Sequence, residues 1–177
     1  MEPETATDFE AFVRGRTPAL LRSAYLLTGD QQLAEDLVQS ALARTHRSWH
    51  RLHAAGNAEA YTRRTMYHLQ VSWWRRRRVA EVLPGTEPGQ APKGRRPDDT
   101  DEITLRLILR TALQRLTVRQ RAVLVLRFFE DRSEQETAEI LGVALGTVKS
   151  QTAKALARLR VVAPELGEFH PTNGVVG

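Results

Sequence analysis

The clearest chemistry in this sequence belongs to a basic segment near its C-terminus. Residues 146–160 read GTVKSQTAKALARLR, with no carboxylate between Thr147 and Arg160. At helical spacing, Val148, Ala155, Leu156 and Leu159 fall on one face. The opposite face then carries the donors Lys149, Ser150, Gln151, Lys154 and Arg158. Such donors suit guanine edges and phosphates, so the segment predicts a DNA-binding helix.

A second, shorter helical pattern precedes this segment, from Glu134 to Leu141, and Gly142 follows it. Two short helices joined by a turn that contains glycine are typical of a helix-turn-helix, whose second helix enters the major groove. The alternative interpretation is a solvated amphipathic surface helix. The turn glycine, the spacing and the sign of the charge together favour the helix-turn-helix.

Another basic cluster lies in the first half of the chain, where Trp73-Trp74 is followed by four arginines, residues 75–78. Aromatic rings that stack on bases, beside arginines that hold the backbone, are how proteins grip single-stranded nucleic acid. The alternative is that Trp73 belongs to the core and that the arginines end a helix, where cations suit the dipole. We assign the arginines to nucleic acid and leave Trp73 open.

Composition points to the same class of partner. The 177 residues carry a net charge of +5 and a pI near 10.2, which favours a polyanionic ligand. There is no cysteine, so disulfides and thiolate metal sites are excluded. The acidic N-terminus is unlike a signal peptide, and no apolar run approaches the length of a membrane span, which predicts a cytoplasmic protein without membrane insertion.

The sequence gives little support for an enzyme or a metal-binding protein. His46, His50 and His53 could form a metal-ligand set, but no cysteine accompanies them and Glu59 lies across a loop. The chain shows no glycine-rich phosphate loop, nucleophile elbow or paired catalytic carboxylates. We therefore predict no metal site, no cofactor and no enzyme.

The hydrophobic periodicity predicts an all-α fold of two small helical domains joined by a flexible linker. Prolines and glycines crowd residues 79–100, which marks the linker. The domains are then residues 8–78 and 101–161, and residues 162–177 form a loose tail. Expected helices are 9–28 (with Pro18 as a bend), 31–49, 58–78, 102–116, 118–130, 134–141 and 145–160, with a loop over 50–57. Thr117 and Ser133 are expected N-caps.

The order of the motifs resembles a known family. A helix bearing Glu35-Asp36-Leu37-Val38-Gln39 is followed by the aromatic and arginine helix, the linker, Leu116-Thr117 with Arg119-Gln120-Arg121, and Gly146-Thr147-Val148-Lys149-Ser150. Over about residues 8–161 this is similar to a bacterial RNA polymerase sigma factor of the extracytoplasmic-function (ECF) group. Trp73-Trp74 and Ser150-Gln151-Thr152 look most like an actinobacterial branch.

The resemblance implies a sigma factor that binds core RNA polymerase, directs it to promoters and assists strand opening. Its partners are then the β′ clamp helices and β flap of the polymerase, promoter DNA and an anti-sigma factor, which is common in the family. Asp36 and Gln39 would contact the clamp helices. The −10 element would meet Asn57, in the loop before the third helix, and His68, Trp74, Arg75, Arg76, Arg77 and Arg78 on that helix. His68 stands where relatives usually have asparagine.

For the −35 element the resemblance nominates Thr147, Lys149, Ser150, Gln151 and Lys154, with Arg158 nearer the phosphates. Many relatives have arginine where Gln151 and Lys154 stand, so base preference is expected to differ. Ala144 replaces the usual serine cap, a loss of roughly 1 kcal/mol. A linker of about 22 residues reaches roughly 75 Å at about 3.3–3.6 Å per residue. That exceeds the roughly 58 Å of a spacer of about 17 base pairs at about 3.4 Å per step.

Two other functions also fit parts of the sequence. A stand-alone regulator with a LuxR-type helix-turn-helix would share Leu116-Thr117 and Thr147-Val148-Lys149. Its N-terminal half would usually be an α/β receiver or sensing domain, whereas residues 8–78 read as wholly helical. A sequestering adaptor that binds only proteins is disfavoured by the arginine run and the basic recognition helix.

Overall fold

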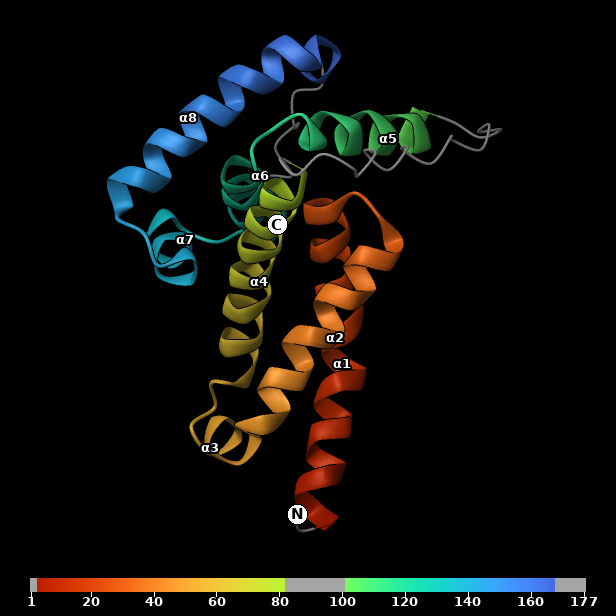
Figure 1. The fold of residues 1–177 in the computed structure, drawn as a ribbon, viewed down its shortest axis with the longest axis vertical. Coiled ribbons are helices and arrows are strands. Elements are labelled where there is room, and N and C mark those ends of the chain that lie inside the picture. The colour runs from red at the N-terminus through yellow and green to blue at the C-terminus, as the bar shows by residue number, and fades with distance from the viewer. Residues whose placement is uncertain (1–2, 82–100, 168–177) are drawn as a thin grey trace, which may run out of the picture.

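The computed structural model describes residues 3–81 and 101–167, and within them every regular element is helical (Figure 1). The N-terminal module comprises α1 (Pro3–Thr28), α2 (Gln31–Arg47), α3 (Trp49–Ala54) and α4 (Ala58–Glu81). The C-terminal module comprises α5 (Asp101–Gln114), α6 (Val118–Leu124), η1 (Val125–Phe129), α7 (Glu134–Leu141), α8 (Leu145–Val162) and η2 (Pro164–Gly167). The predicted all-α fold is confirmed.

The N-terminal module is a bundle of three long helices. Gly29 adopts a left-handed φ of 73° that turns the chain between α1 and α2, and Asp30 caps α2 by accepting from the Leu33 amide at 2.8 Å. Leu27, Leu37 and Met66, from α1, α2 and α4, are at most 1% exposed in the shared core. The expected bend at Pro18 does not interrupt α1, which is continuous through it.

The predicted loop over residues 50–57 is wrong, because most of it forms α3. Trp49 and Leu52 are buried against Phe9 and Phe12 of α1, and that burial fixes a short helix where periodicity gave no signal. Ser48 separates α2 from α3, so the second helix ends two residues earlier than predicted. Gly56, with φ 67°, then turns the chain toward α4.

The C-terminal module starts its helices with the expected caps. Thr117 and Ser133 each form a capping box, with Gln120 and Glu136 respectively. Gly142 ends α7 with φ 66°, as a helix-turn-helix requires. Ala144 makes no side-chain cap on α8, as predicted.

The predicted single helix over 118–130 is divided by a π-helical turn. After α6, the Glu130 amide donates to the Val125 carbonyl at 3.0 Å, a five-residue spacing. The turn ends at Phe129 with Glu130 as its C-cap, and Asp131 follows with a φ of 52°. The apolar run continues through both segments, so the sequence pattern does not show where the hydrogen-bond register changes.

The ends of the modules also differ from the predicted boundaries. Helix α5 ends at Gln114 and α4 continues to Glu81, so residues 79–81 belong to a helix and not to the linker. Helix α8 runs to Val162, Ala163 is 2% exposed and η2 follows, so residues 162–167 are not a loose tail. The remainder of the predicted linker (82–100) and tail (168–177) lies outside the described residues.

The two modules pack against each other. Helix α4 contacts α6 and α7, and α1 contacts α5, α6 and η1. Ala122, Val125 and Leu126 of the C-terminal module join the core of the N-terminal module. Figure 1 shows α4 running beside the second module along the length of α6 and α7. We call this contact the module interface.

The uncapped start of α8 gives a prediction about stability. Ala144→Ser should raise the free energy of unfolding by about 1 kcal/mol, because a serine hydroxyl can accept from a first-turn amide that no side chain now caps. Urea denaturation followed by circular dichroism measures the change. Ala157→Ser, at an exposed position inside the same helix, should lower stability slightly. Equal effects of the two substitutions would contradict the capping argument.

Candidate nucleic-acid interface

Helix α8 presents the basic face that its sequence predicts. Val148 and Ala155 are fully buried and hold the helix against α6 and α7. The predicted donors Lys149, Ser150, Lys154 and Arg158 are exposed, whereas Thr147 and Gln151 are half-buried. All six residues nominated for the −35 element therefore lie on one helix. Four of them are exposed on the side away from its core contacts.

Two of these donors have partners within the module. Lys149 Nζ lies 3.9 Å from a carboxylate oxygen of Glu134, on the first turn of α7, with both side chains well exposed. The Ser150 hydroxyl donates to the Thr147 carbonyl at 3.1 Å, which leaves its oxygen free to accept. The weak ion pair is open to water and yields readily to a phosphate or base edge.

Helix α4 carries the residues nominated for single-stranded DNA. His68, Arg75 and Arg76 are exposed, and Arg76 donates to the Ser72 hydroxyl at 3.2 Å. Asn57 is exposed where the chain enters α4. The side chains of Trp74, Arg77 and Arg78 lie outside the described residues. Trp73, which the sequence left open, packs half-buried against the N-terminal core.

Helix α2 separates its residues as predicted. Leu37 and Val38 are at most 2% exposed in the core, and Asp36 and Gln39 are exposed on the outer face. The two polar groups are three residues apart on one side of the helix. They form a small acidic and amide surface that no described element covers.

His46 and His53 lie in an aromatic cluster. The His46 ring is 4.7 Å from the Phe9 ring, and the His53 ring is 5.0 Å from the ring of the buried Trp49. His53 Nε2 also lies 3.6 Å from a carboxylate oxygen of Asp8. Within residues 3–81 and 101–167, no group of three or more His, Asp or Glu side chains could hold a metal ion.

A buried arginine that sequence reasoning did not assign lies at the module interface. Arg121 is 7% exposed and donates to the carbonyls of Leu113 at 2.8 Å and Leu116 at 3.2 Å, near the end of α5. It also donates to the Leu27 carbonyl, at the end of α1. Carbonyls at helix C-termini lack helical partners and carry partial negative charge, which suits a guanidinium. Burial lowers the pKa of Arg121 to about 10.

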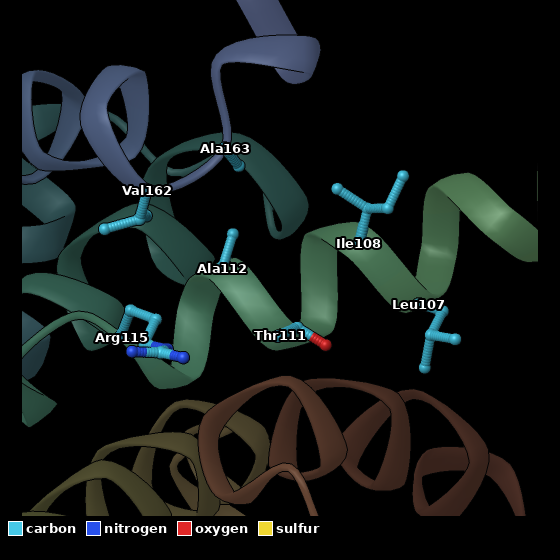
Figure 2. Close-up of a pocket in the computed structure, with 7 residues that line it drawn as sticks. All are labelled: Leu107, Ile108, Thr111, Ala112, Arg115, Val162 and Ala163. Atoms are coloured by element: carbon cyan, nitrogen blue, oxygen red, sulfur yellow. The ribbon is translucent and has the colours of Figure 1, made fainter. Parts of the chain in front are cut away.

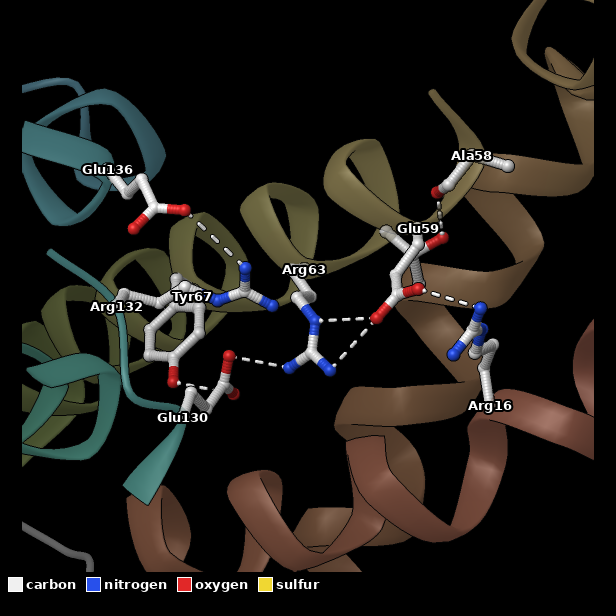
Figure 3. Close-up of polar contacts among 9 residues, drawn as sticks. Arg16, Ala58, Glu59, Arg63, Tyr67, Glu130, Arg132 and Glu136 are labelled. Atoms are coloured by element: carbon white, nitrogen blue, oxygen red, sulfur yellow. Dashed lines mark hydrogen bonds and ion pairs between the residues drawn. The ribbon is translucent and has the colours of Figure 1, made fainter. Parts of the chain in front are cut away.

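A second buried polar cluster was also missed, and Figure 3 shows it between α4 and the segment after η1. Glu130 Oε2 lies 2.5 Å from Arg63 Nη1, with side chains 5% and 11% exposed. The Tyr67 hydroxyl donates to Glu130 at 3.1 Å. Arg63 also pairs with Glu59 at 3.1 Å, and Glu59 pairs with Arg16 at 3.1 Å. Burial, and then the Glu130 charge, raise the pKa of Tyr67 well above its usual value.

The C-terminal module has an open, largely apolar groove whose lining residues are drawn in Figure 2. It lies between α5 and the end of α8 and has a volume of about 440 Å³. Leu107, Ile108, Ala112, Val162 and Ala163 supply most of its lining. Leu107 is 40% exposed and the neighbouring Val161 is 72% exposed. These two side chains add exposed apolar surface beside the groove.

This geometry accords with the comparisons with known proteins. Residues 12–79 match the family Sigma-70 region 2, and residues 106–159 match Sigma-70, region 4. The chain is 45% identical over 153 residues to the RNA polymerase sigma-E factor of Streptomyces coelicolor, covering 86% of this chain and 84% of the relative. It is 32% identical to the ECF RNA polymerase sigma factor SigL of Mycobacterium tuberculosis, with 84% of each chain covered.

A solved structure shows the same arrangement of helices. The sigma factor RpoE of Bartonella quintana, in complex with the anti-sigma factor NepR, matches with a TM-score of 0.71 and 26% identity. The match covers 89% of this chain and 97% of that chain. Two sigma-70 regions on a wholly helical scaffold define the class as a sigma factor. The chain belongs to the ECF RNA polymerase sigma factors.

The two rival functions from the sequence lose their support. A LuxR-type regulator is not favoured, because the N-terminal half is a helical sigma-70 region 2. An adaptor without a DNA role does not account for a matched region 4 with a basic recognition helix. No helix in the described ranges is long and apolar enough to cross a membrane.

Proposed function

We propose that this ECF sigma factor binds core RNA polymerase through two surfaces, one on each module. The first is the Asp36 and Gln39 face of α2, which is polar, exposed and held rigidly by the buried Leu37 and Val38. The second is the apolar groove between α5 and α8, which suits the β flap. The factor itself performs no covalent chemistry and acts with the polymerase in the cytoplasm.

In this proposal α4 and the turn before it hold the melted −10 strand. The exposed Asn57, His68, Arg75 and Arg76 supply polar and cationic groups along one helix. Trp74, Arg77 and Arg78 would extend that surface. Arginines bind the backbone of a single strand while aromatic rings stack on its bases, so the composition suits strand capture.

The −35 element is then read by α8. The observation that carries this assignment is the exposed basic face of a helix that packs into the helix-turn-helix through the buried Val148 and Ala155. Thr147, Ser150 and Gln151 lie on its first turns, where recognition helices reach base edges. Arg158 is two turns further on and suits a phosphate.

An anti-sigma factor is the remaining partner. The matched Bartonella sigma factor is bound to one. The exposed Leu107 and Val161 and the groove beside them offer an apolar surface that both the polymerase and an inhibitor could use. Competition for that surface would let an inhibitor exclude the polymerase.

The α2 surface gives a prediction about polymerase affinity. The double substitution Asp36→Ala and Gln39→Ala should weaken binding to core polymerase about tenfold, or about 1.4 kcal/mol. Helicity should not change, because neither side chain is buried. Glu10→Ala removes an exposed carboxylate from α1 and is the control for lost charge. Unchanged affinity of the double variant for core polymerase would remove this assignment.

The arginines of α4 give a prediction about promoter opening. Arg75→Ala with Arg76→Ala should leave polymerase recruitment intact but reduce permanganate reactivity of the melted strand at least severalfold. Arg14→Ala with Arg22→Ala removes the same charge from exposed positions on α1 and should open the promoter normally. Full opening by the α4 variant would mean that these arginines only end a helix.

The −35 helix gives a prediction about sequence preference. Gln151→Ala or Lys154→Ala should change the ranking of promoters in a library randomised at the −35 element, because a lost base contact costs about 1–3 kcal/mol at one position. Arg158→Ala should instead reduce transcription from all sequences alike and lower the salt slope by about one unit. A wild-type ranking with the Gln151 and Lys154 variants would show that they do not read bases.

A further inference from the structure

Four of the DNA-binding residues proposed for the two modules line a single groove. It lies between α4 on one side and α6, α7 and α8 on the other, with a volume of about 230 Å³. His68 and Arg75 of α4 face it, and so do Thr147 and Gln151 of α8. A Cβ placed on Gly142, in the turn of the helix-turn-helix, would lie 3.6 Å from Cε1 of His68. The single-strand surface and the recognition helix are therefore neighbours.

This arrangement does not suit simultaneous contact with both promoter elements. The spacer that the family resemblance implies, about 17 base pairs, separates the two elements by roughly 58 Å at about 3.4 Å per step. Residues that line one groove cannot reach across that distance. The groove is also smaller than the roughly 300–1,000 Å³ of ordinary ligand pockets, so it has no room for duplex DNA. The modules must separate before the sigma factor can engage a promoter.

Glu130 joins the modules through a buried charge with two partners across the interface. Its carboxylate is almost completely buried, and its partners Arg63 and Tyr67 are both on α4 of the other module. Tyr67 remains a neutral donor, since burial and the carboxylate raise the pKa of its phenol. Arg63 is held in place by Glu59 of its own module, at 3.1 Å.

The backbone around Glu130 is also unusual. The π-helical turn of η1 and the left-handed Asp131 flank it, and the Arg132 amide closes the segment onto the Leu126 carbonyl at 2.9 Å. An extra residue in a turn redirects the next side chain, since each helical residue rotates by about 100° at 3.6 residues per turn. Rare π turns are frequent at functional sites. Here the turn directs Glu130 toward α4.

Other polar contacts also cross the module interface, among them the hydrogen bond that Arg110 of α5 donates to the Tyr25 hydroxyl of α1. Arg121 donates to Leu27 of α1, but it also bonds carbonyls of its own module and would keep those bonds after separation. Gln114 donates to the Leu26 carbonyl at 3.3 Å and packs against Gly29. By contrast, separation would expose both Glu130 and Arg63 to water, which solvates each charge.

We propose that the Glu130–Arg63 ion pair holds the modules in a closed arrangement that keeps His68 and Arg75 beside the start of the recognition helix, and that breaking it opens the sigma factor for promoter binding. The inference rests on the proposed function for the roles of the residues that line the groove. A ligand shifts such an equilibrium only through a difference in its affinity for the two states. DNA and polymerase that hold the modules apart supply that difference.

The separation of the modules tests the proposal directly. The chain has no cysteine, so Ala11→Cys and Ala157→Cys, both at exposed positions, allow one donor and one acceptor dye. Glu130→Gln should raise the ratio of open to closed molecules at least tenfold in single-molecule energy transfer. Glu139→Gln, an exposed carboxylate on α7, is the matched control and should leave the ratio unchanged.

A double-mutant cycle separates the ion pair from general destabilisation. Arg63→Gln alone should open the molecule to a similar extent, and the pair Arg63→Gln with Glu130→Gln should open it no further than either alone. Circular dichroism should show native helicity in every variant. A wild type that is already open, or a Glu130→Gln protein as closed as Glu139→Gln, would overturn the proposal.

DNA binding by the free chain supplies the second readout. At one salt concentration, the Glu130→Gln protein should bind a −35 duplex about tenfold more tightly than the Glu139→Gln protein in fluorescence anisotropy. Opening without tighter binding would overturn the claim that the neighbouring α4 obstructs duplex DNA at the start of the recognition helix. Transcription by wild-type protein with core polymerase tests the proposed function separately. Absence of transcription would contradict the proposed function. The energy-transfer measurement would still test whether the ion pair holds the modules closed.

Discussion

The phenol of Tyr67 is fully buried on α4, at the point where the cores of the two modules meet. A buried hydroxyl needs a hydrogen-bond partner, and Glu130 accepts from it. A buried carboxylate in turn needs a cation, which Arg63 provides. Arg63 is balanced by Glu59, and Glu59 by the exposed Arg16. A single buried ring thus determines a chain of charges that reaches from the core to the surface.

The two buried arginines are stabilised in different ways, with different consequences for the fold. Arg121 has carbonyl partners at the ends of α5 and α1, and its burial lowers its pKa without removing its charge at neutral pH. It therefore organises the C-terminal module and adds one bond across the interface. Arg63 has carboxylate partners, one from each module. Its environment changes fundamentally if the modules separate.

The elements that could be predicted from sequence are those whose signal is local. The caps at Thr117 and Ser133, the turn at Gly142 and the basic face of α8 depend on residues a few positions apart. Helix α3 was missed because Trp49 packs on Phe9 and Phe12, about forty residues away, so burial and not periodicity forms it. The π turn was missed because its apolar residues fit either register.

The module interface had no sequence signal at all. Tyr67 and Glu130 are 63 positions apart, and each alone resembles an ordinary helix residue. The candidate site was easier, because the exposure of Asp36, Gln39 and the α8 donors follows from the apolar stripes beside them. What periodicity does not reveal is that Lys149 has Glu134 as a partner, or that His68 lies at the turn of the other module.

A buried ion pair adds little net stability compared with apolar residues of similar volume, but removing one partner leaves the other charge buried and unpaired, which is costly. At the module interface the ion pair therefore matters because it permits the modules to separate. An interface made only of residues such as Val125 and Leu126 would expose apolar surface when the modules part. Glu130 and Arg63 regain hydration at that moment, which lowers the cost of opening. An ion pair surrounded by apolar contacts therefore specifies one closed orientation of the modules and still lets them separate.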